Sequence, residues 1–272
     1  MELGDLHPAV ARLFRRANIQ QHTEEWYDKR GKMLTASDVA TTLHVNPYQS
    51  RTRLLLQKLV QQPPAFALGD ELVEKLKKPN NTGNFMTTYG NAMEDVAARR
   101  YEETRGCKSL SFGLFVHPEH EWLGASPDRV TCDGTLVEIK CPVLRTITAE
   151  VPVYYYPQIQ VLLEVLDLEA CDFVQFRPET AWVNEELVVT RVPRDRAWFE
   201  RELPRMRSFY DDWMSIKRDP DEYYAFVRDH APKPRASRKR APDSPGEPPV
   251  YPFLAPEETN VCWHSLNEIA SE

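Results

Sequence analysis

Apolar residues recur at helical spacing through the first sixty or so residues of the chain. Together with the polar residues that precede each segment, this periodicity predicts four short helices, over 8–19, 24–30, 37–43 and 50–60. A longer helical segment over 88–105 ends before Gly106, a residue type that often terminates helices. The first part of the chain is therefore expected to be helical.

Short β-type segments follow. The chain contains predicted strands at 110–116, 122–126 and 135–140, then a helix over 155–166, two strands at 172–178 and 186–193, and a closing helix over 195–217. This order favours an α/β fold in which a mixed central sheet is flanked by helices.

The patterning also divides the chain. We expect one domain over 1–231, with a helical N-terminal part at about 1–86 and a core at about 87–217. The remaining segment, 232–272, begins with a stretch rich in Pro, Ser and Arg that cannot support a packed core, and it is interpreted as a flexible tail.

Composition narrows the classes of protein. No apolar run approaches the length of about 20 residues that a bilayer requires, and the first residues do not resemble a secretory signal, so a soluble intracellular protein is expected. Five scattered cysteines without a CxxC pair argue against a zinc ribbon or an iron–sulfur cluster. The formal net charge of −7, from 34 basic and 41 acidic residues, argues against a wholly basic nucleic-acid-binding protein.

The predicted strand TLVEIK carries two charged residues on one face. Side chains alternate along a strand, so Glu138 and Lys140 point one way and Val137 and Ile139 the other. In the run GASPD, Asp128 follows the preceding predicted strand. If 122–127 and 135–140 pair as neighbours, the two carboxylates converge, and carboxylate oxygens suit a hard divalent cation.

A third acid comes from the long helix. Glu94 shares a helical face with Ala97, Ala98 and Tyr101, which places a carboxylate on an otherwise apolar stripe. A buried carboxylate requires a partner, and a metal ion is one.

Each of these signals also has a plain structural explanation. An E-x-K pair on a strand is commonly a local ion pair at the surface, Glu94 can lie on the exposed side of its helix, and Pro-Asp is commonly only a turn. The order and spacing of all three together favour a metal site.

The run GASPD, followed after nine residues by EIKCP, resembles the PD-(D/E)xK nuclease signature. Its form here is similar to that of the lambda exonuclease and YqaJ-type viral recombinase family. Three further segments, 23–40, 89–97 and 154–160, follow in the order of that family. The resemblance implies a restriction-endonuclease-like fold and a deoxyribonuclease that depends on Mg²⁺, for which Mn²⁺ can substitute, with two ions per site.

The resemblance also implies residue roles. It assigns metal coordination to Glu94, Asp128, Glu138 and the backbone carbonyl of Ile139, and makes Lys140 the catalytic lysine. Gln160 matches a glutamine-bearing helix behind the site, with Gln158 as the alternative. Residues two apart cannot share a helix face, so at most one of them reaches the centre.

A phosphate site is expected nearby. Thr35 or Ser37 can cap the helix that begins there, and a helix N-terminus attracts phosphate. The resemblance assigns binding of a terminal 5′-phosphate to Arg30, Ser37, Ser126 and Arg145, although the spacing to Arg145 differs by one residue. For Ser37, a plain capping role remains an equal alternative.

Two further segments have open interpretations. Trp26 and Tyr27 can stack on a DNA end, but packing of Trp26 on the core is preferred. The basic run at 233–240 suits a nuclear-import signal in a eukaryotic host or an electrostatic DNA anchor, with a solubilising tail as the alternative.

The resemblance implies a 5′-to-3′ exonuclease on double-stranded DNA ends that leaves 3′ single-stranded tails for recombination in a virus or phage. It further implies a single-strand annealing protein as a partner and a homotrimer. The alternatives are an endonuclease of the same superfamily and an inactive DNA-binding or recruiting protein.

Overall fold

The computed structural model describes residues 6–16, 18–77, 85–180 and 183–232, without the side chains of 85–87. The chain divides into two units. The first, Met1–Pro178 with Glu185–Ala231, contains the helices and strands of the described residues. In the second, Glu179–Asn184 with Pro232–Glu272, Thr180 and Val183 form a β-bridge. The basic run at 233–240 lies outside the described residues.

The four predicted N-terminal helices are confirmed. They are α1 (Pro8–Arg15), α2 (Glu24–Gly31), α3 (Ala36–Thr42) and α4 (Arg51–Gln61). The first is shorter than expected because Ile19 forms a β-bridge with Leu114 instead of continuing the helix. A short 3₁₀ segment, η2 (Ala65–Ala67), and α5 (Glu71–Leu76) follow.

Among the described residues, the strands form two sheets. A three-stranded sheet has the order β1 (Leu34–Thr35), β4 (Leu123–Ala125) and β3 (Phe115–Val116). A five-stranded mixed sheet has the order β2 (Ser109–Leu110), β5 (Arg129–Thr131), β6 (Leu136–Lys140), β7 (Ala170–Arg177) and β8 (Glu186–Pro193). Within it β6 and β7 are parallel, and the other pairs are antiparallel.

The expected pairing of 122–127 with 135–140 is wrong. β4 belongs to the smaller sheet, and β6 pairs instead with β5, where Arg129 lies opposite Val137. Pro127 separates the two short strands, and since proline has no N–H to donate it commonly interrupts a strand. The predicted strand 110–116 is likewise divided between β2 and β3, which lie in different sheets.

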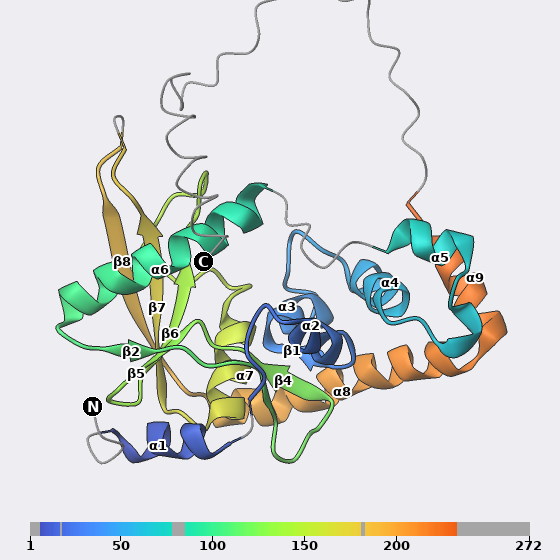
Figure 1. Ribbon diagram of the computed structural model, residues 1–272, viewed down its shortest axis with the longest axis horizontal. Coiled ribbons are helices and arrows are strands. Elements are labelled where there is room, and N and C mark those ends of the chain that lie inside the picture. Colours follow the sequence, from blue (N-terminus) through green and yellow to red (C-terminus); the bar gives the residue numbers. More distant parts are fainter. Residues whose placement is uncertain (1–5, 17, 78–84, 181–182, 233–272) are drawn as a thin grey trace, which may run out of the picture. The chain divides into compact units, whose positions relative to one another are not determined.

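Helices cover both faces of the five-stranded sheet. α6 (Phe85–Arg105) lies across one face, as Figure 1 shows, and its Ala97 and Tyr101 pack against Val137 and Ile139 of β6. On the opposite face lies α7 (Tyr156–Leu166), which connects the parallel strands β6 and β7. The predicted alternation along β6 is therefore confirmed: Glu138 and Lys140 are on the α7 side.

Two helices complete the first unit. The predicted closing helix is α8 (Arg196–Arg218), and it is followed by α9 (Pro220–His230), which the sequence pattern did not reveal. The signal for α9 was present, because Pro220 occupies its first turn and Asp219 caps it by accepting from two backbone N–H groups.

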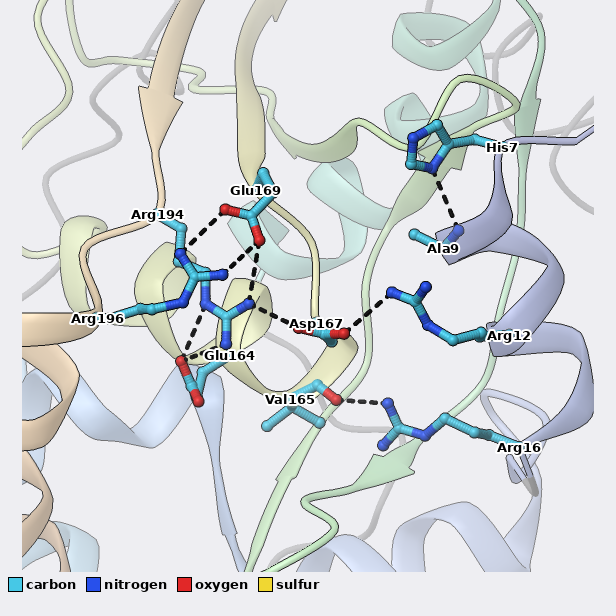
Figure 2. A network of polar contacts seen from close by, with 10 residues as sticks. All are labelled: His7, Ala9, Arg12, Arg16, Glu164, Val165, Asp167, Glu169, Arg194 and Arg196. Carbon is cyan, nitrogen blue, oxygen red and sulfur yellow. Dashed lines mark hydrogen bonds and ion pairs between the residues drawn. The ribbon is translucent and has the colours of Figure 1, made fainter.

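A network of ion pairs anchors α7. Arg194, whose side chain is 7% exposed, contacts Glu164, Asp167 and Glu169, as Figure 2 shows. Asp167 also pairs with Arg12 of α1. These contacts join the last turn of α7 to the start of β7, the end of β8 and the first helix, so the position of α7 behind β6 is fixed. No helix in the described ranges is long and apolar enough to cross a bilayer.

Candidate active site

A cleft of about 750 Å³ opens beside the end of β6. Its lining includes Glu94 from α6, Asp128 from the segment between β4 and β5, and Ile139 and Lys140 from β6. With Arg145, which lines the same cleft, five of the residues singled out from the sequence therefore meet in one cavity, although they come from separate parts of the chain.

Asp128 reaches β6 because it directly precedes β5. Its Oδ2 accepts a hydrogen bond from the backbone N–H of Ile139 at 2.7 Å. The carboxylate is thus held against the strand that carries Glu138 and Lys140, as expected, but through β5 and not through β4.

Glu138 is fully buried, on the α7 side of β6. Its Oε1 accepts from Lys140 Nζ and from Gln158 Nε2, each at 2.5 Å. Its Oε2 has no hydrogen-bond partner among the described residues. Burial and the nearby charge of Asp128 raise the pKa of Glu138, although Lys140 opposes the shift.

Lys140 places a positively charged side chain beside Glu138 and Asp128. Burial alone would lower its pKa, but Glu138 and Asp128 outweigh burial and raise the pKa above its ordinary value. The side chain therefore remains an ammonium at neutral pH and cannot act as a general base. Its Nζ lies 5.3 Å from the centre of the Tyr155 ring.

Glu94 is half-buried on α6, on the stripe that the sequence predicted, and contacts Arg129. The Arg129 Nη1 donates to Glu94 Oε1 at 3.1 Å and to the backbone carbonyl of Asp128 at 2.6 Å. Its Nη2 contacts Asp95. Burial, followed by the charge of Asp128, raises the pKa of Glu94, and Arg129 opposes that shift. Arg129 was missed from the sequence, where an arginine at the start of a strand has no distinctive signal.

The donor set fits a hard divalent cation. The carboxylates of Glu94, Asp128 and Glu138 are oxygen ligands, and the unpartnered Oε2 of Glu138 is a buried acceptor that a cation would satisfy. In the present side-chain positions, Glu94 contacts Arg129 and Asp128 accepts from Ile139. Accordingly, no three acids, histidines or cysteines in the described part of the chain already form a complete metal cage.

Gln158, and not Gln160, faces the carboxylates. Gln160 is buried away from them: its Nε2 donates to the carbonyl of Pro193 at 2.9 Å, and its Oε1 accepts from the N–H of Asp195 at 2.7 Å. The placement expected for Gln160 is therefore wrong. Its amide joins α7 to the end of β8, whereas Gln158 contacts Glu138.

Three of the four expected phosphate-binding residues form a connected cluster. Arg30 Nη2 donates to Ser37 Oγ at 3.3 Å, and its guanidinium lies 4.3 Å from the centre of the Trp26 ring. The indole N–H of Trp26 donates to Ser126 Oγ at 3.1 Å. Trp26 is 8% exposed and packs on Met33 and Leu114, which confirms the preferred packing interpretation.

The N-cap of α3 is Thr35, which decides between the two residues proposed for it. Asp38 Oδ2 accepts from the backbone N–H of Thr35 at 3.0 Å and from its hydroxyl at 2.7 Å. Ser37 lies in the first turn, is exposed, and shares its hydroxyl with Thr35 and Arg30. The capping explanation for Ser37 is therefore wrong.

An ion pair between Lys58 and Asp38 holds the segment that carries Ser37. Lys58 Nζ lies 2.8 Å from Asp38 Oδ2 and donates to the carbonyl of Met33 at 2.9 Å. Lys58 therefore fixes the segment between α2 and α3 onto α4. The sequence pattern missed it, because a lysine within an amphipathic helix usually faces solvent.

Arg145 lies in the cleft with Asp128 and Lys140. Its Nη1 donates to Gln175 Oε1 at 2.7 Å, while its Nη2 is buried without a hydrogen-bond partner among the described residues. Arg145 thus belongs to the carboxylate cleft and makes no hydrogen bond to the described residues of the Arg30 cluster.

Comparison with known proteins gives concordant results. The model of the YqaJ-like viral recombinase domain matches residues 25–169, more than half of the chain. The structure of an alkaline exonuclease from Laribacter hongkongensis is 25% identical, with a TM-score of 0.59, over 75% of this chain and 98% of that one. The same enzyme in complex with dAMP gives 26% identity, the same TM-score and the same coverage.

A viral relative matches over a shorter span. An uncharacterized protein of Acanthamoeba polyphaga mimivirus is 27% identical over 175 residues, which make up 58% of this chain and 29% of that protein. The mixed sheets flanked by helices agree with the restriction-endonuclease-like fold expected from the sequence. The chain belongs to the YqaJ-like viral recombinase family.

Proposed function

We propose that this protein is a Mg²⁺-dependent nuclease that hydrolyses DNA from the 5′ end and leaves a 3′ single-stranded tail for recombination. The observation that carries the proposal is the convergence of Glu94, Asp128 and Lys140 in one cleft, above the buried Glu138. The likeness to an alkaline exonuclease over nearly the whole length of that enzyme supports it.

The carboxylates of Glu94, Asp128 and Glu138, with the carbonyl of Ile139, would hold the cation. When bound, Mg²⁺ supplies a Lewis acid that polarises the scissile phosphate and lowers the pKa of a water molecule; Mn²⁺ substitutes for it, and two ions are proposed per site. Lys140, protonated and fixed by Glu138, orients the attacking water and offsets the negative charge that develops on the phosphate. Gln158 holds Glu138 from the opposite side.

The preference for a 5′ end comes from the Arg30 cluster. The Arg30 guanidinium lies over the Trp26 ring and donates to the Ser37 hydroxyl, while the indole N–H donates to the Ser126 hydroxyl. This cluster offers the donors that a terminal phosphate requires. Ser126 precedes Asp128 by two residues, so the Arg30 cluster and the carboxylate cleft share one short segment of the chain. Arg145, inside the cleft, is proposed to bind the backbone phosphate of the same strand.

Catalysis is tested with Lys140→Ala on linear duplex DNA. Wild-type protein with Mg²⁺ should shorten the duplex, and the variant should be slower by at least about 100-fold, because the charge that stabilises the transition state is absent. Lys108→Ala is the matched control, since Lys108 is exposed and does not line the cleft. Full activity of Lys140→Ala would contradict the assignment.

Polarity is tested with duplexes labelled at either the 5′ or the 3′ end. Early release of the 5′ label with retention of the 3′ label is expected, and the reverse order would contradict the proposed direction. Wild-type protein should also prefer 5′-phosphate over 5′-hydroxyl ends, and Arg30→Ala should abolish that preference. Cleavage of supercoiled circles would instead indicate an endonuclease.

Assembly is a separate part of the proposal. By the family resemblance, we propose a homotrimer that encloses duplex DNA and acts with a single-strand annealing protein. Light scattering of the purified protein should give three times the mass of one chain; a monomer that digests DNA without processivity would contradict the trimer and leave the nuclease proposal intact.

A further inference from the structure

One wall of the catalytic cleft is aromatic. Tyr48, in the loop between α3 and α4, and Tyr154 and Tyr155, which precede α7, line the same cleft as Lys140 and Arg145. These tyrosines play no part in the chemistry proposed above. Tyr154 and Tyr155 lie in the family-like segment 154–160 and Tyr48 lies outside the family-like segments, but none of the three has an assigned role. Their arrangement therefore requires its own explanation.

The rings form a continuous series from the core to solvent. Tyr155 packs on the buried Phe173, with ring centroids 5.3 Å apart. Tyr154 lies 4.5 Å from Tyr155, and Tyr48 lies edge-on to Tyr154 at 5.5 Å. Tyr48 is 76% exposed. The inner rings are thus fixed by packing, and the outermost presents most of its surface at the mouth of the cleft.

The loop that carries Tyr48 is held by its own hydrogen bonds. The backbone N–H of Tyr48 donates to Asn46 Oδ1 at 2.9 Å, and Asn46 Nδ2 donates to Thr41 Oγ1 of α3 at 2.8 Å. The backbone N–H of Asn46 donates to the carbonyl of Ala40 at 3.1 Å. An exposed ring on an anchored loop is a preorganised contact surface and contributes little to the core.

Cations accompany the rings. Lys140 Nζ lies 5.3 Å, and the Arg145 guanidinium 6.0 Å, from the centre of the Tyr155 ring. The cleft therefore offers positive charge for a phosphate and, next to it, an aromatic surface. A DNA strand carries phosphates and bases in alternation, and these match the positive charge and the aromatic surface respectively. Base stacking on aromatic side chains tolerates any sequence.

We propose that Tyr48 stacks on an unpaired base of the DNA strand whose phosphate occupies the cleft; this inference rests on the nuclease function proposed above. Inside a duplex both faces of a base are covered by its neighbours. A base that stacks on Tyr48 must therefore have left the helical stack, so the site engages a frayed or single-stranded end more readily than an intact blunt end.

The test measures binding without hydrolysis, in EDTA, by fluorescence anisotropy. The probes are single-stranded oligonucleotides that contain one abasic residue, placed in turn at each position near the 5′ end, so that a base is removed and every phosphate remains. With wild-type protein, one position should weaken binding about tenfold. With Tyr48→Ala, the intact oligonucleotide should bind about tenfold more weakly, and the abasic substitution should have no further effect.

Two variants make the result specific. Tyr48→Phe retains the ring and should retain the abasic effect, whereas Leu68→Ala, which removes an exposed apolar side chain (65% exposed) outside the cleft lining, should behave as wild type. Circular dichroism confirms that each variant is folded. If Tyr48→Ala keeps the full abasic effect at every position, or if Tyr48→Phe loses it, stacking is overturned.

The outcome is distinguishable from failure of the nuclease proposal. Absence of Mg²⁺-dependent hydrolysis by wild-type protein would overturn the nuclease function whatever the binding result. Normal hydrolysis together with an unchanged abasic profile for Tyr48→Ala would overturn only the stacking role. As a second measurement, a mismatched 5′ end should recover most of the rate that Tyr48→Ala loses on blunt duplex, because the cost of unpairing is then smaller.

Discussion

Arg129 contacts Glu94 across the candidate active site, with Nη1 to Oε1 at 3.1 Å. The two side chains are only 14% and 29% exposed, so solvent screens this pair less than a surface ion pair. Arg129 also contacts Asp95 and the carbonyl of Asp128. One guanidinium thereby joins α6 to β5 and supplies positive charge at a place where carboxylates gather.

Replacing this charge should destabilise the protein in a metal-dependent way. Arg129→Gln is expected to lower the free energy of unfolding by about 2 kcal/mol in EDTA, because Glu94 loses its charged partner. In Mg²⁺ the loss should be smaller, since a cation held by Glu94 compensates for the missing guanidinium. Thermal and urea unfolding with and without Mg²⁺ provide the measurement.

The control is Arg100→Gln on the same helix. Arg100 pairs with Glu103 and Glu185 at the surface, where its side chain is 44% exposed, so its replacement should change stability little in either condition. An equal loss for Arg129→Gln in EDTA and in Mg²⁺ would show that its role does not involve the charge of a metal site.

The two glutamines of α7 should give opposite results. Gln158→Ala removes a contact to Glu138 and is expected to reduce kcat by about tenfold or more with little change in stability. Gln160→Ala leaves the carbonyl of Pro193 and the N–H of Asp195 unpaired, and is expected to cost about 2 kcal/mol in stability while kcat changes little. Steady-state kinetics at low temperature and urea unfolding separate the two effects. A loss of kcat confined to Gln160→Ala would reverse the assignment.

Local sequence patterns predicted part of the site, but they did not decide between Gln158 and Gln160. The strand alternation that placed Glu138 beside Lys140, and the apolar stripe that placed Glu94, are local patterns, and both were read correctly. The choice between Gln158 and Gln160 required the rotation of α7 about its axis. That helix is apolar on nearly all sides, so its sequence shows no clear inward face.

The pairing of the short strands was also not predicted correctly from the sequence. β4 and β5 have three residues each, too few for a readable alternation, and they belong to different sheets. Asp128 lies between them, so its position beside β6 was expected for the wrong reason. The Arg129–Glu94 and Lys58–Asp38 contacts join segments distant in the chain, and neither partner carries a sequence signal for the other.

His117 should make stability depend on pH. It is 5% exposed, its Nδ1 accepts from two backbone N–H groups, and its Nε2 is buried without a partner among the described residues. Burial, followed by the charges of His120, Arg16 and Arg194, lowers the pKa of His117 from 6.5 to about 4. Between these values the unfolded chain binds a proton that the folded protein does not. Stability from the neutral ring is therefore complete above pH 6.5 and is lost as the pH falls toward about 4.

His117→Asn tests this dependence, because it keeps an acceptor near Nδ1 and removes the titration. The variant should be less stable than wild type at pH 7, through lost packing against Phe199. The difference should shrink by roughly 2 to 3 kcal/mol as the pH falls to 4. Urea unfolding at several pH values measures it. Parallel stability curves for the two proteins would contradict a neutral buried His117.

Disrupting the Lys58–Asp38 pair should lower the free energy of unfolding more than most single substitutions do. Burial raises the pKa of Asp38, but Lys58, Thr35 and Arg30 together outweigh burial and the net pKa is lowered. The charged carboxylate therefore stabilises the fold above the ordinary carboxyl pKa, and this effect is lost as the pH falls below it. Lys58→Met should cost about 3 kcal/mol at pH 7, because it leaves the Asp38 carboxylate charged and without its ammonium partner.

The double variant Lys58→Met, Asp38→Asn decides whether charge or packing is responsible. If the charge left on Asp38 causes the loss, removing that charge restores part of the stability, and the double variant is less destabilised than the sum of the two single variants by more than about 1 kcal/mol. Strict additivity in urea unfolding would mean that the two side chains act independently. Because Lys58 also donates to the carbonyl of Met33, some loss of stability should remain in the double variant, and the 5′-phosphate preference proposed for Arg30 should weaken with it.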